Sequence, residues 1–296
     1  MIEQLPMIDI DPLRCMSDSA AIEATAQQID AACRAFGFFY AVGHGIAPAI
    51  VSDLLAASRA FFGLPDIEKA RIAMDRGGIA WRGWFPVAGE LTSGIPDLKE
   101  GLYLGEELGT DDPRVAAGLP LHGANLWPDA VPALRPAVEA YLPAATRAGE
   151  ALMRGMALAL GLDPGHFAGG LTRNPTLLFR IFHYPATPAS EGGLGVGEHS
   201  DYGLLTLLGQ DDKGGLEVRT RQGWIDVPPR GDALVINVGD MFERLTRGRF
   251  RSAPHRVVNR AAGSRYSFPL FFDPDFVADV EPLPIESRCA SSPVST

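Results

Sequence analysis

Apolar and polar positions repeat with different periods in the two halves of the chain, and the change of period predicts the elements. In the first half, apolar residues recur every three or four positions, which is the spacing of an amphipathic helix. Helices are therefore expected at residues 19–35, 48–62 and within 130–160. Short apolar strands are expected at residues 6–10 and 38–42, with Gly37 ending the helix before the second of them.

The pattern of the second half predicts strands. From residue 176 to residue 273, short apolar runs are separated by Gly, Pro and Asp, which is typical of an all-β barrel or sandwich. Residues 75–128 are rich in Gly, Pro and Trp and have weak periodicity, which predicts long loops with short strands. Loops of this length in a compact domain are often functional.

Composition narrows the class of protein. The chain has 296 residues, 46% of them hydrophobic, which is enough for a large core. Its 26 basic and 36 acidic residues give a net charge of −10, which argues against nucleic acid as a main partner. The first ten residues lack a signal-peptide pattern, and no apolar run reaches the roughly 18 residues that cross a bilayer, so no membrane association is expected. Three widely separated cysteines, Cys15, Cys33 and Cys289, favour a reducing cytoplasm.

Two histidines and one aspartate carry the strongest chemical signal. His199 and Asp201 stand two residues apart in Gly-Glu-His-Ser-Asp-Tyr, and His255 follows in Ser-Ala-Pro-His-Arg-Val. Residues two apart on a strand point to the same face, so His199 and Asp201 can act together, and His255 must come from another strand. Two imidazoles and one carboxylate make a facial triad that leaves metal positions open and suits iron(II).

A second polar pair follows the last of these residues. Arg265 and Ser267 share one face of a predicted strand ten residues after His255. A guanidinium grips a carboxylate with two parallel hydrogen bonds, and a neighbouring hydroxyl can add a third. The pair therefore predicts a carboxylate clamp near the metal.

The ordered set of motifs resembles the iron(II)- and 2-oxoglutarate-dependent oxygenases of the isopenicillin N synthase-like family. The resemblance is strongest over about residues 175–275, and Gly37-Phe-Phe-Tyr-Ala-Val-Gly-His-Gly in the first half also matches. The matching motifs in the second half are Tyr184-Pro, His199-Ser-Asp-Tyr-Gly-Leu-Leu-Thr-Leu-Leu, Gly214-Gly-Leu, Gly223-Trp-Ile, Asn237-Val-Gly-Asp, Ser252-Ala-Pro-His-Arg-Val and Arg265-Tyr-Ser.

The resemblance implies a role for each matching residue. His199, Asp201 and His255 would bind iron, Arg265 and Ser267 would hold the distal carboxylate of 2-oxoglutarate, and Tyr184 would add a hydrogen bond to it. Many plant members carry Asn two residues before that tyrosine, where this chain has Phe182. With O2, such enzymes release succinate and CO2 and oxidise a C–H bond by hydroxylation, desaturation or cyclisation.

The expected fold is mainly β with α: a double-stranded β-helix, or jelly roll, flanked by N-terminal helices. Residues 1–165 would form a helical and mixed region packing on the barrel, and residues 175–275 the oxygenase core. The Pro- and Ser-rich residues 280–296 would form a flexible tail.

The substrate is a small molecule that the sequence does not specify. We expect the loop around Trp81, Arg82 and Trp84, with Phe271 from the barrel, to contact it, because aromatic walls and one orienting charge are common in small-molecule pockets. For Asn237 two roles stay open, turn chemistry and a position near the metal. Two other functions are weighed: an isopenicillin N synthase-like oxidase that consumes no 2-oxoglutarate, and a non-catalytic jelly-roll binding protein. Oligomeric state is not predicted.

Overall fold

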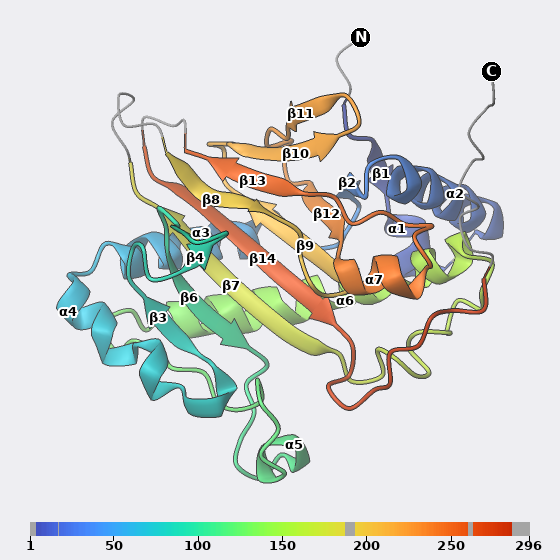
Figure 1. Ribbon diagram of the computed structural model, residues 1–296. Helices are drawn as coiled ribbons and strands as arrows, with labels where there is room; N and C mark the ends of the chain where they lie inside the picture. Colours follow the sequence, from blue (N-terminus) through green and yellow to red (C-terminus); the bar gives the residue numbers. More distant parts are fainter. Residues whose placement is uncertain (1–3, 17, 187–192, 260–262, 286–296) are drawn as a thin grey trace.

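The molecule is built in layers around one large sheet. The computed structural model describes residues 4–16, 18–186, 193–259 and 263–285. In these residues, a helical layer covers one face of an eight-stranded sheet, and a four-stranded sheet meets the other face (Figure 1). We call the face that meets the small sheet the inner face. Two facing sheets of mainly antiparallel strands give the predicted jelly roll.

The large sheet draws its strands from the whole chain. Its order is β1-β2-β12-β9-β14-β7-β6-β3, and only β1 and β2 pair in parallel among these strands. The strands are Met7–Asp9 (β1), Phe38–Val42 (β2), Leu234–Val238 (β12), Leu205–Gln210 (β9), Arg265–Asp273 (β14), Thr176–Tyr184 (β7), Glu100–Gly105 (β6) and Gly83–Phe85 (β3). The N-terminal region thus does more than pack on the barrel, because it supplies the strands at both edges of the sheet.

The small sheet and a separate hairpin complete the β structure. The small sheet consists of Gly223–Asp226 (β11), Leu216–Thr220 (β10), His255–Val258 (β13) and Leu194–His199 (β8), in that order. The hairpin pairs Leu91–Thr92 (β4) with Ile95–Pro96 (β5) and lies against β8.

The three predicted helices, at residues 19–35, 48–62 and within 130–160, are present as α2, α3 and α6, and four shorter α-helices of the described residues were not predicted. The α-helices are Asp11–Cys15 (α1), Ser19–Ala35 (α2), Pro48–Phe62 (α3), Asp66–Lys69 (α4), Pro113–Ala116 (α5), Leu134–Ala159 (α6) and Asp240–Leu245 (α7). The Asp18 side chain caps α2 by accepting from the Ala20 N–H at 3.0 Å. Gly37 follows α2 with φ +70°, and a Cβ there would lie 2.0 Å from the Arg251 carbonyl oxygen. The predictions for α2 and α3 are confirmed.

Strand alternation decides which residues reach the inner face. Helix α6 packs against β9 and β14, and α1, α2 and α3 pack on α6 (Figure 1). The even-numbered residues of β14 from Tyr266 to Phe272 belong to the core on this helical side. The odd-numbered residues from Arg265 to Asp273 therefore face the small sheet.

The C-terminal segment is held down where it is described. Leu283 is buried, its N–H donates to the Leu245 carbonyl at 2.9 Å, and its own carbonyl accepts from Arg247 Nε at 3.0 Å. The described start of the predicted tail thus contacts the body of the protein through Leu283, and its remainder, residues 286–296, lies outside the described residues. No helix in the described part of the chain is long and apolar enough to cross a membrane.

Candidate active site

A cavity of about 510 Å³ opens between the two sheets. Its walls come from the inner face of β7 and β14, from β8 and β13 of the small sheet, and from residues of the N-terminal region. The structure brings six predicted residues to this cavity: His199, Asp201, His255, Arg265, Ser267 and Tyr184. Phe271, predicted as a substrate contact, lines it as well.

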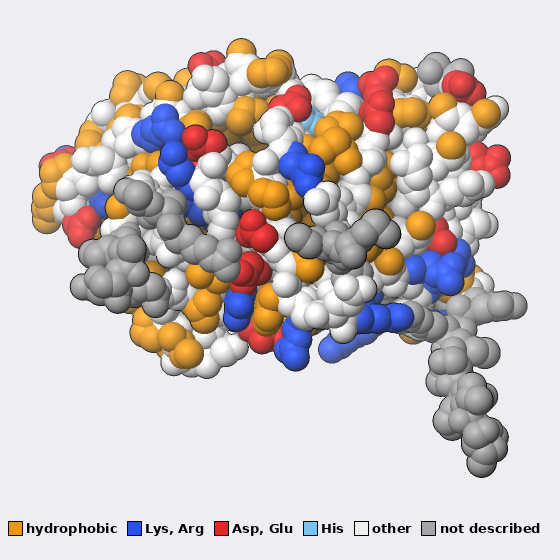
Figure 2. Space-filling view, turned by 90° about the horizontal axis from the view of Figure 1, so that it is seen from above, with side chains coloured by type: hydrophobic (Ala, Val, Ile, Leu, Met, Phe, Trp, Pro, Cys, Tyr) orange, Lys and Arg blue, Asp and Glu red, His pale blue; other side chains and the backbone are white. Residues whose placement is uncertain are grey.

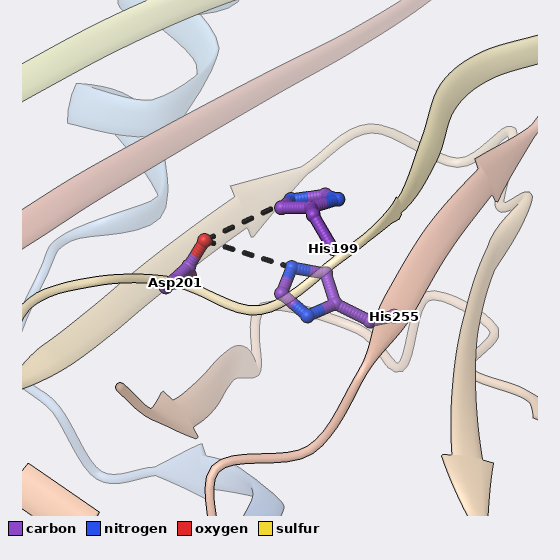
Figure 3. A group of neighbouring side chains, drawn as sticks. All are labelled: His199, Asp201 and His255. Carbon is purple, nitrogen blue, oxygen red and sulfur yellow. Dashed lines mark ion pairs between the residues drawn. The ribbon is translucent and has the colours of Figure 1, made fainter. Parts of the chain in front are cut away.

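The three candidate metal ligands meet at one point of the cavity. His199 is the last residue of β8, Asp201 lies just beyond it, and His255 opens β13 in direct register with His199. Asp201 Oδ1 lies 3.8 Å from His199 Nε2 and 3.7 Å from His255 Nε2 (Figure 3). The candidate ligand atoms all lie within 4.8 Å of one another. Asp201 is in a loop and not on the strand, so strand alternation alone does not explain its direction.

Backbone carbonyls orient both imidazoles. His199 Nδ1 lies 2.8 Å from the Gly197 carbonyl oxygen, and His255 Nδ1 lies 3.2 Å from that of Ala253. A carbonyl only accepts, so each Nδ1 carries a proton, and in the neutral imidazole each Nε2 presents a lone pair. Both lone pairs face the same carboxylate oxygen, an arrangement that a cation between them would stabilise.

The Asp201 carboxylate is oriented by two buried residues. Its Oδ2 accepts from Thr206 Oγ1 at 2.5 Å and from Asn237 Nδ2 at 2.8 Å. These bonds leave Oδ1 free to face the two histidines. Asn237 thus lies beside the candidate metal ligands, on β12, and not in a turn. Thr206 was missed by sequence reasoning, although it follows Asp201 by only five residues.

The charge states match a divalent cation. Burial opposes ionisation of Asp201, but the nearby histidines and the two hydrogen bonds together bring its pKa below the usual value. Burial lowers the pKa of His255, which favours the neutral imidazole. An ionised carboxylate and imidazoles with free Nε2 atoms are the forms that bind iron(II), so these residues fit the metal.

Arg265 is a buried cation with unsatisfied donors. It is 2% exposed, and its Nε and Nη1 have no hydrogen-bond partner among the described residues. Nη2 makes one long bond of 3.5 Å to Gln210 Oε1, and the guanidinium lies 4.6 Å from the centre of the Tyr184 ring. Ser267 lies two residues along the same face. A buried cation that opens to a cavity needs an anion, and a carboxylate matches its geometry.

Comparison with known proteins places the chain in a family. A model described as the 2OG-Fe(II) oxygenase superfamily matches residues 175–274, and one described as the N-terminal region of non-haem dioxygenases in morphine synthesis matches residues 5–130. A 2-oxoglutarate-dependent dioxygenase of Monascus ruber is 37% identical over 291 residues, covering 94% of this chain and 87% of that protein. The chain belongs to the 2-oxoglutarate and iron(II)-dependent oxygenases.

Other members of this oxygenase family are also similar over nearly the whole chain. A homoarginine-6-hydroxylase of Arabidopsis thaliana is 35% identical over 295 residues, covering 96% of this chain and 88% of that protein. The crystal structure of a Neurospora crassa protein in complex with alpha-KG and thymine superposes with a TM-score of 0.81 at 27% identity, covering 95% of this chain and 88% of that one. The protein is thus a dioxygenase that uses iron, 2-oxoglutarate and O2. The relatives give no support to the oxidase or the non-catalytic alternative.

Two residues expected at the substrate of this oxygenase lie elsewhere. Arg82 is buried and donates from Nη2 to the Leu121 carbonyl at 2.8 Å, and it does not line the cavity. Trp84 pairs with Leu102 on β6, belongs to the core on the helical side, and donates to Glu100 Oε2 at 2.8 Å. Their positions do not fit a substrate wall. Trp81 from the same loop does line the cavity, because its left-handed backbone, φ 55°, redirects the chain.

A polar wall from the N-terminal region was not predicted. We call Trp81, Glu90, Thr92, Asp97, Lys99 and Tyr103, which all line the cavity, the N-terminal wall. Arg180 of β7 lines the cavity beside it. For Arg180 a signal was available, because it shares strand parity with Tyr184. Trp81 belongs to the loop that composition marked, and no comparable signal marks the other residues of the N-terminal wall.

Proposed function

We propose that His199, Asp201 and His255 bind the iron of this dioxygenase through two Nε2 atoms and Oδ1. The support is that these three atoms make no hydrogen bond within the described residues and lie close together. The other polar atom of each side chain, Nδ1 or Oδ2, is fixed by a hydrogen bond. Thr206 and Asn237 are then positioning residues, since they hold the carboxylate at the angle the metal requires.

Arg265 and Ser267 are proposed to hold the distal carboxylate of 2-oxoglutarate, with Tyr184 beside them. The observation that carries this is the pair of unsatisfied N–H donors on Arg265, buried at the cavity wall. The Tyr184 ring, 4.6 Å from the guanidinium carbon, restricts the movement of the fork and so helps to aim it. When bound, iron and 2-oxoglutarate with O2 supply the oxidant for a C–H bond, and succinate and CO2 leave.

The primary substrate is proposed to be a small metabolite. The cavity of about 510 Å³ is in the range of small-molecule sites, and among the relatives one is named for homoarginine and another is in complex with thymine. Phe271 and Trp81 line the cavity and offer apolar surface to such a substrate. Hydroxylation, desaturation and cyclisation all begin with attack on such a bond.

The proposed setting is a reducing cytoplasm without nucleic acid as a partner. Cys15 and Cys33, the cysteines among the described residues, are free thiols. On the face shown in Figure 2, the described Lys and Arg side chains lie in separate groups among acidic and apolar ones. Dispersed positive charge is a poor match to a phosphate backbone.

Alanine at each ligand position tests the metal assignment. In His199→Ala, Asp201→Ala and His255→Ala we expect loss of iron and of succinate release, with an unchanged circular dichroism spectrum, because two ligands cannot hold iron in the active geometry. The matched control is His166→Ala, which removes an exposed histidine outside the cavity. Wild-type iron content and turnover in any of the three variants would refute the assignment.

A further inference from the structure

Arg180 is a second buried arginine of the same cavity. It lies on β7 with its side chain on the inner face, as Tyr184 does. At about 3.3 Å per residue, their separation of four positions corresponds to about 13 Å along the strand. Arg180 is 4% exposed, and it faces a part of the cavity separate from the Arg265 clamp.

The Arg180 guanidinium is held in place but not neutralised. It lies 3.5 Å from the centre of the Tyr103 ring, its cross-strand partner on β6. Its hydrogen bonds run from Nη1 to the carbonyls of Phe179 and Leu104, at 3.3 and 3.5 Å. Both are long, and within the described residues no carboxylate forms a salt bridge with this side chain.

The two carboxylates that act most on the charge of Arg180, Glu90 and Asp273, already have other partners. Glu90 forms a salt bridge with Lys99 at 2.8 Å and accepts a hydrogen bond from the Tyr103 hydroxyl. Asp273 accepts from the Leu204 N–H at 3.1 Å. Burial lowers the pKa of Arg180 to about 9 despite these carboxylates, as expected of a cation short of counter-charge.

A comparison with Arg82 shows why Arg180 is a candidate for ligand binding and Arg82 is not. Arg82 is similarly buried and has two donors without a partner among the described residues, but it does not line this cavity, and Leu121 accepts from it at 2.8 Å. Arg180 opens to a cavity that a ligand can enter. A stacked guanidinium with free edges there is the arrangement that recognises a planar anion.

We propose that Arg180 binds a carboxylate of the primary substrate, so that the substrate is a small organic acid. This inference rests on the proposed function, because it takes the Arg265 clamp to be filled by 2-oxoglutarate. Tyr103 fixes the plane of the Arg180 fork, and Phe271, on the inner face of the neighbouring strand β14, offers an apolar surface to the substrate chain. The acid is then anchored apart from the cosubstrate, with its C–H bonds toward the metal ligands.

Paired probes test the proposal. A panel of small aliphatic and aromatic carboxylic acids, each with its primary amide, is titrated by calorimetry into protein loaded anaerobically with iron and saturating 2-oxoglutarate. The amide keeps the shape and removes the charge. For wild type we expect acids to bind about tenfold or more tightly than their amides, because charge-assisted hydrogen bonds are the stronger ones. Arg180→Gln should abolish this preference, and Arg180→Lys should retain part of it.

Two further variants make the outcomes distinct. Arg219→Gln removes an exposed arginine of the small sheet and should keep the full acid preference. Arg265→Gln should weaken 2-oxoglutarate binding instead. Equal affinity of wild type for acids and amides, or an acid preference that survives in Arg180→Gln, overturns the inference. Failure of wild type to bind 2-oxoglutarate, with the acid preference intact and dependent on Arg180, overturns the proposed function alone.

Discussion

Two walls of one cavity use their polar groups in opposite ways. On the N-terminal wall the charged side chains satisfy one another: Lys99 contacts Asp97 at 2.5 Å and Glu90 at 2.8 Å, and Thr92 donates to Asp97 at 2.9 Å. On the wall formed by the core strands, which we call the core wall, Arg265 and Arg180 have no carboxylate partner within the described residues. The ligand atoms of the triad are also free on one side.

The difference indicates that the N-terminal wall closes the cavity and that the core wall binds the ligands. In the N-terminal wall each buried charge has a partner, so the loss of any one of them would leave another unpaired. The hairpin β4–β5 lies between these residues in the chain and closes the cavity against β8, where Ser93 Oγ donates to the Glu198 carbonyl at 3.1 Å. Buried charges without partners cost stability and are available to ligands. The pKa values follow this division. Burial opposes the charge of Lys99, yet its carboxylate neighbours raise its pKa, whereas burial lowers that of Arg180.

The largest expected effect comes from breaking the N-terminal wall. Lys99→Met leaves Asp97 and Glu90 without their shared cation, and removing one member of a buried pair typically costs about 3 kcal/mol or more. We expect the free energy of unfolding in urea to fall by that amount at pH 7, while iron affinity changes little. Lys213→Met, which removes an exposed lysine paired with Asp212, is the matched control. An equal loss of iron affinity and stability would show that the two walls are not separable.

On the core wall the sign of the effect should reverse. Burial raises the pKa of Asp273 to about 6, from an ordinary 3.8. Between about pH 4 and 6 the unfolded chain releases this proton and the folded chain keeps it, so Asp273 lowers stability as the pH rises through that window. A shift of about two pKa units corresponds to roughly 3 kcal/mol. Asp273→Asn keeps an oxygen for the Leu204 N–H and should be more stable than wild type above pH 6 by roughly 2–3 kcal/mol.

The pH series identifies the cause of that gain. The stabilities of Asp273→Asn and wild type in thermal and urea unfolding should converge near pH 3, below both pKa values, where the carboxyl is largely protonated in both states of the wild type. Asp129→Asn, which removes an exposed carboxylate, controls for the change in net charge. A gain in stability that is the same at pH 3 and pH 7 would mean that packing, and not ionisation, is responsible.

The two walls also differ in what the sequence revealed. The triad and clamp residues were predictable because each stands in a short motif: His199 and Asp201 lie two residues apart, and so do Arg265 and Ser267 on one strand. The helices α2 and α3 were predictable from their period. Both the site motifs and the helical period can be found in short stretches of the sequence.

Short stretches of sequence do not show which distant strands will pair with each other. The joining of β2 to β12 and of β6 to β7 in one sheet depends on partners more than 70 residues away. The misplacement of Arg82 and Trp84 has the same origin, since the left-handed residue Trp81 changes the direction of the chain and β3 turns Trp84 toward the helices. Composition marked the correct loop, and only the fold selects which of its side chains reach the cavity.

The smallest expected effect is on the core wall, at the clamp. Arg265→Lys keeps the positive charge but replaces a two-pronged donor by a single ammonium group. Losing one charge-assisted hydrogen bond, worth on the order of 1.5–3 kcal/mol, should weaken 2-oxoglutarate about tenfold or more, with iron affinity nearly constant. Anaerobic titration of 2-oxoglutarate into the iron-loaded protein measures this directly, and Arg219→Lys is the control at an exposed arginine.

Because the unsatisfied donors of Arg265 cost stability in the free protein, the same variant should unfold no more easily than wild type when 2-oxoglutarate is absent. A lysine variant with wild-type affinity would mean that the Arg265 fork faces no carboxylate, and that the core wall binds its cosubstrate elsewhere.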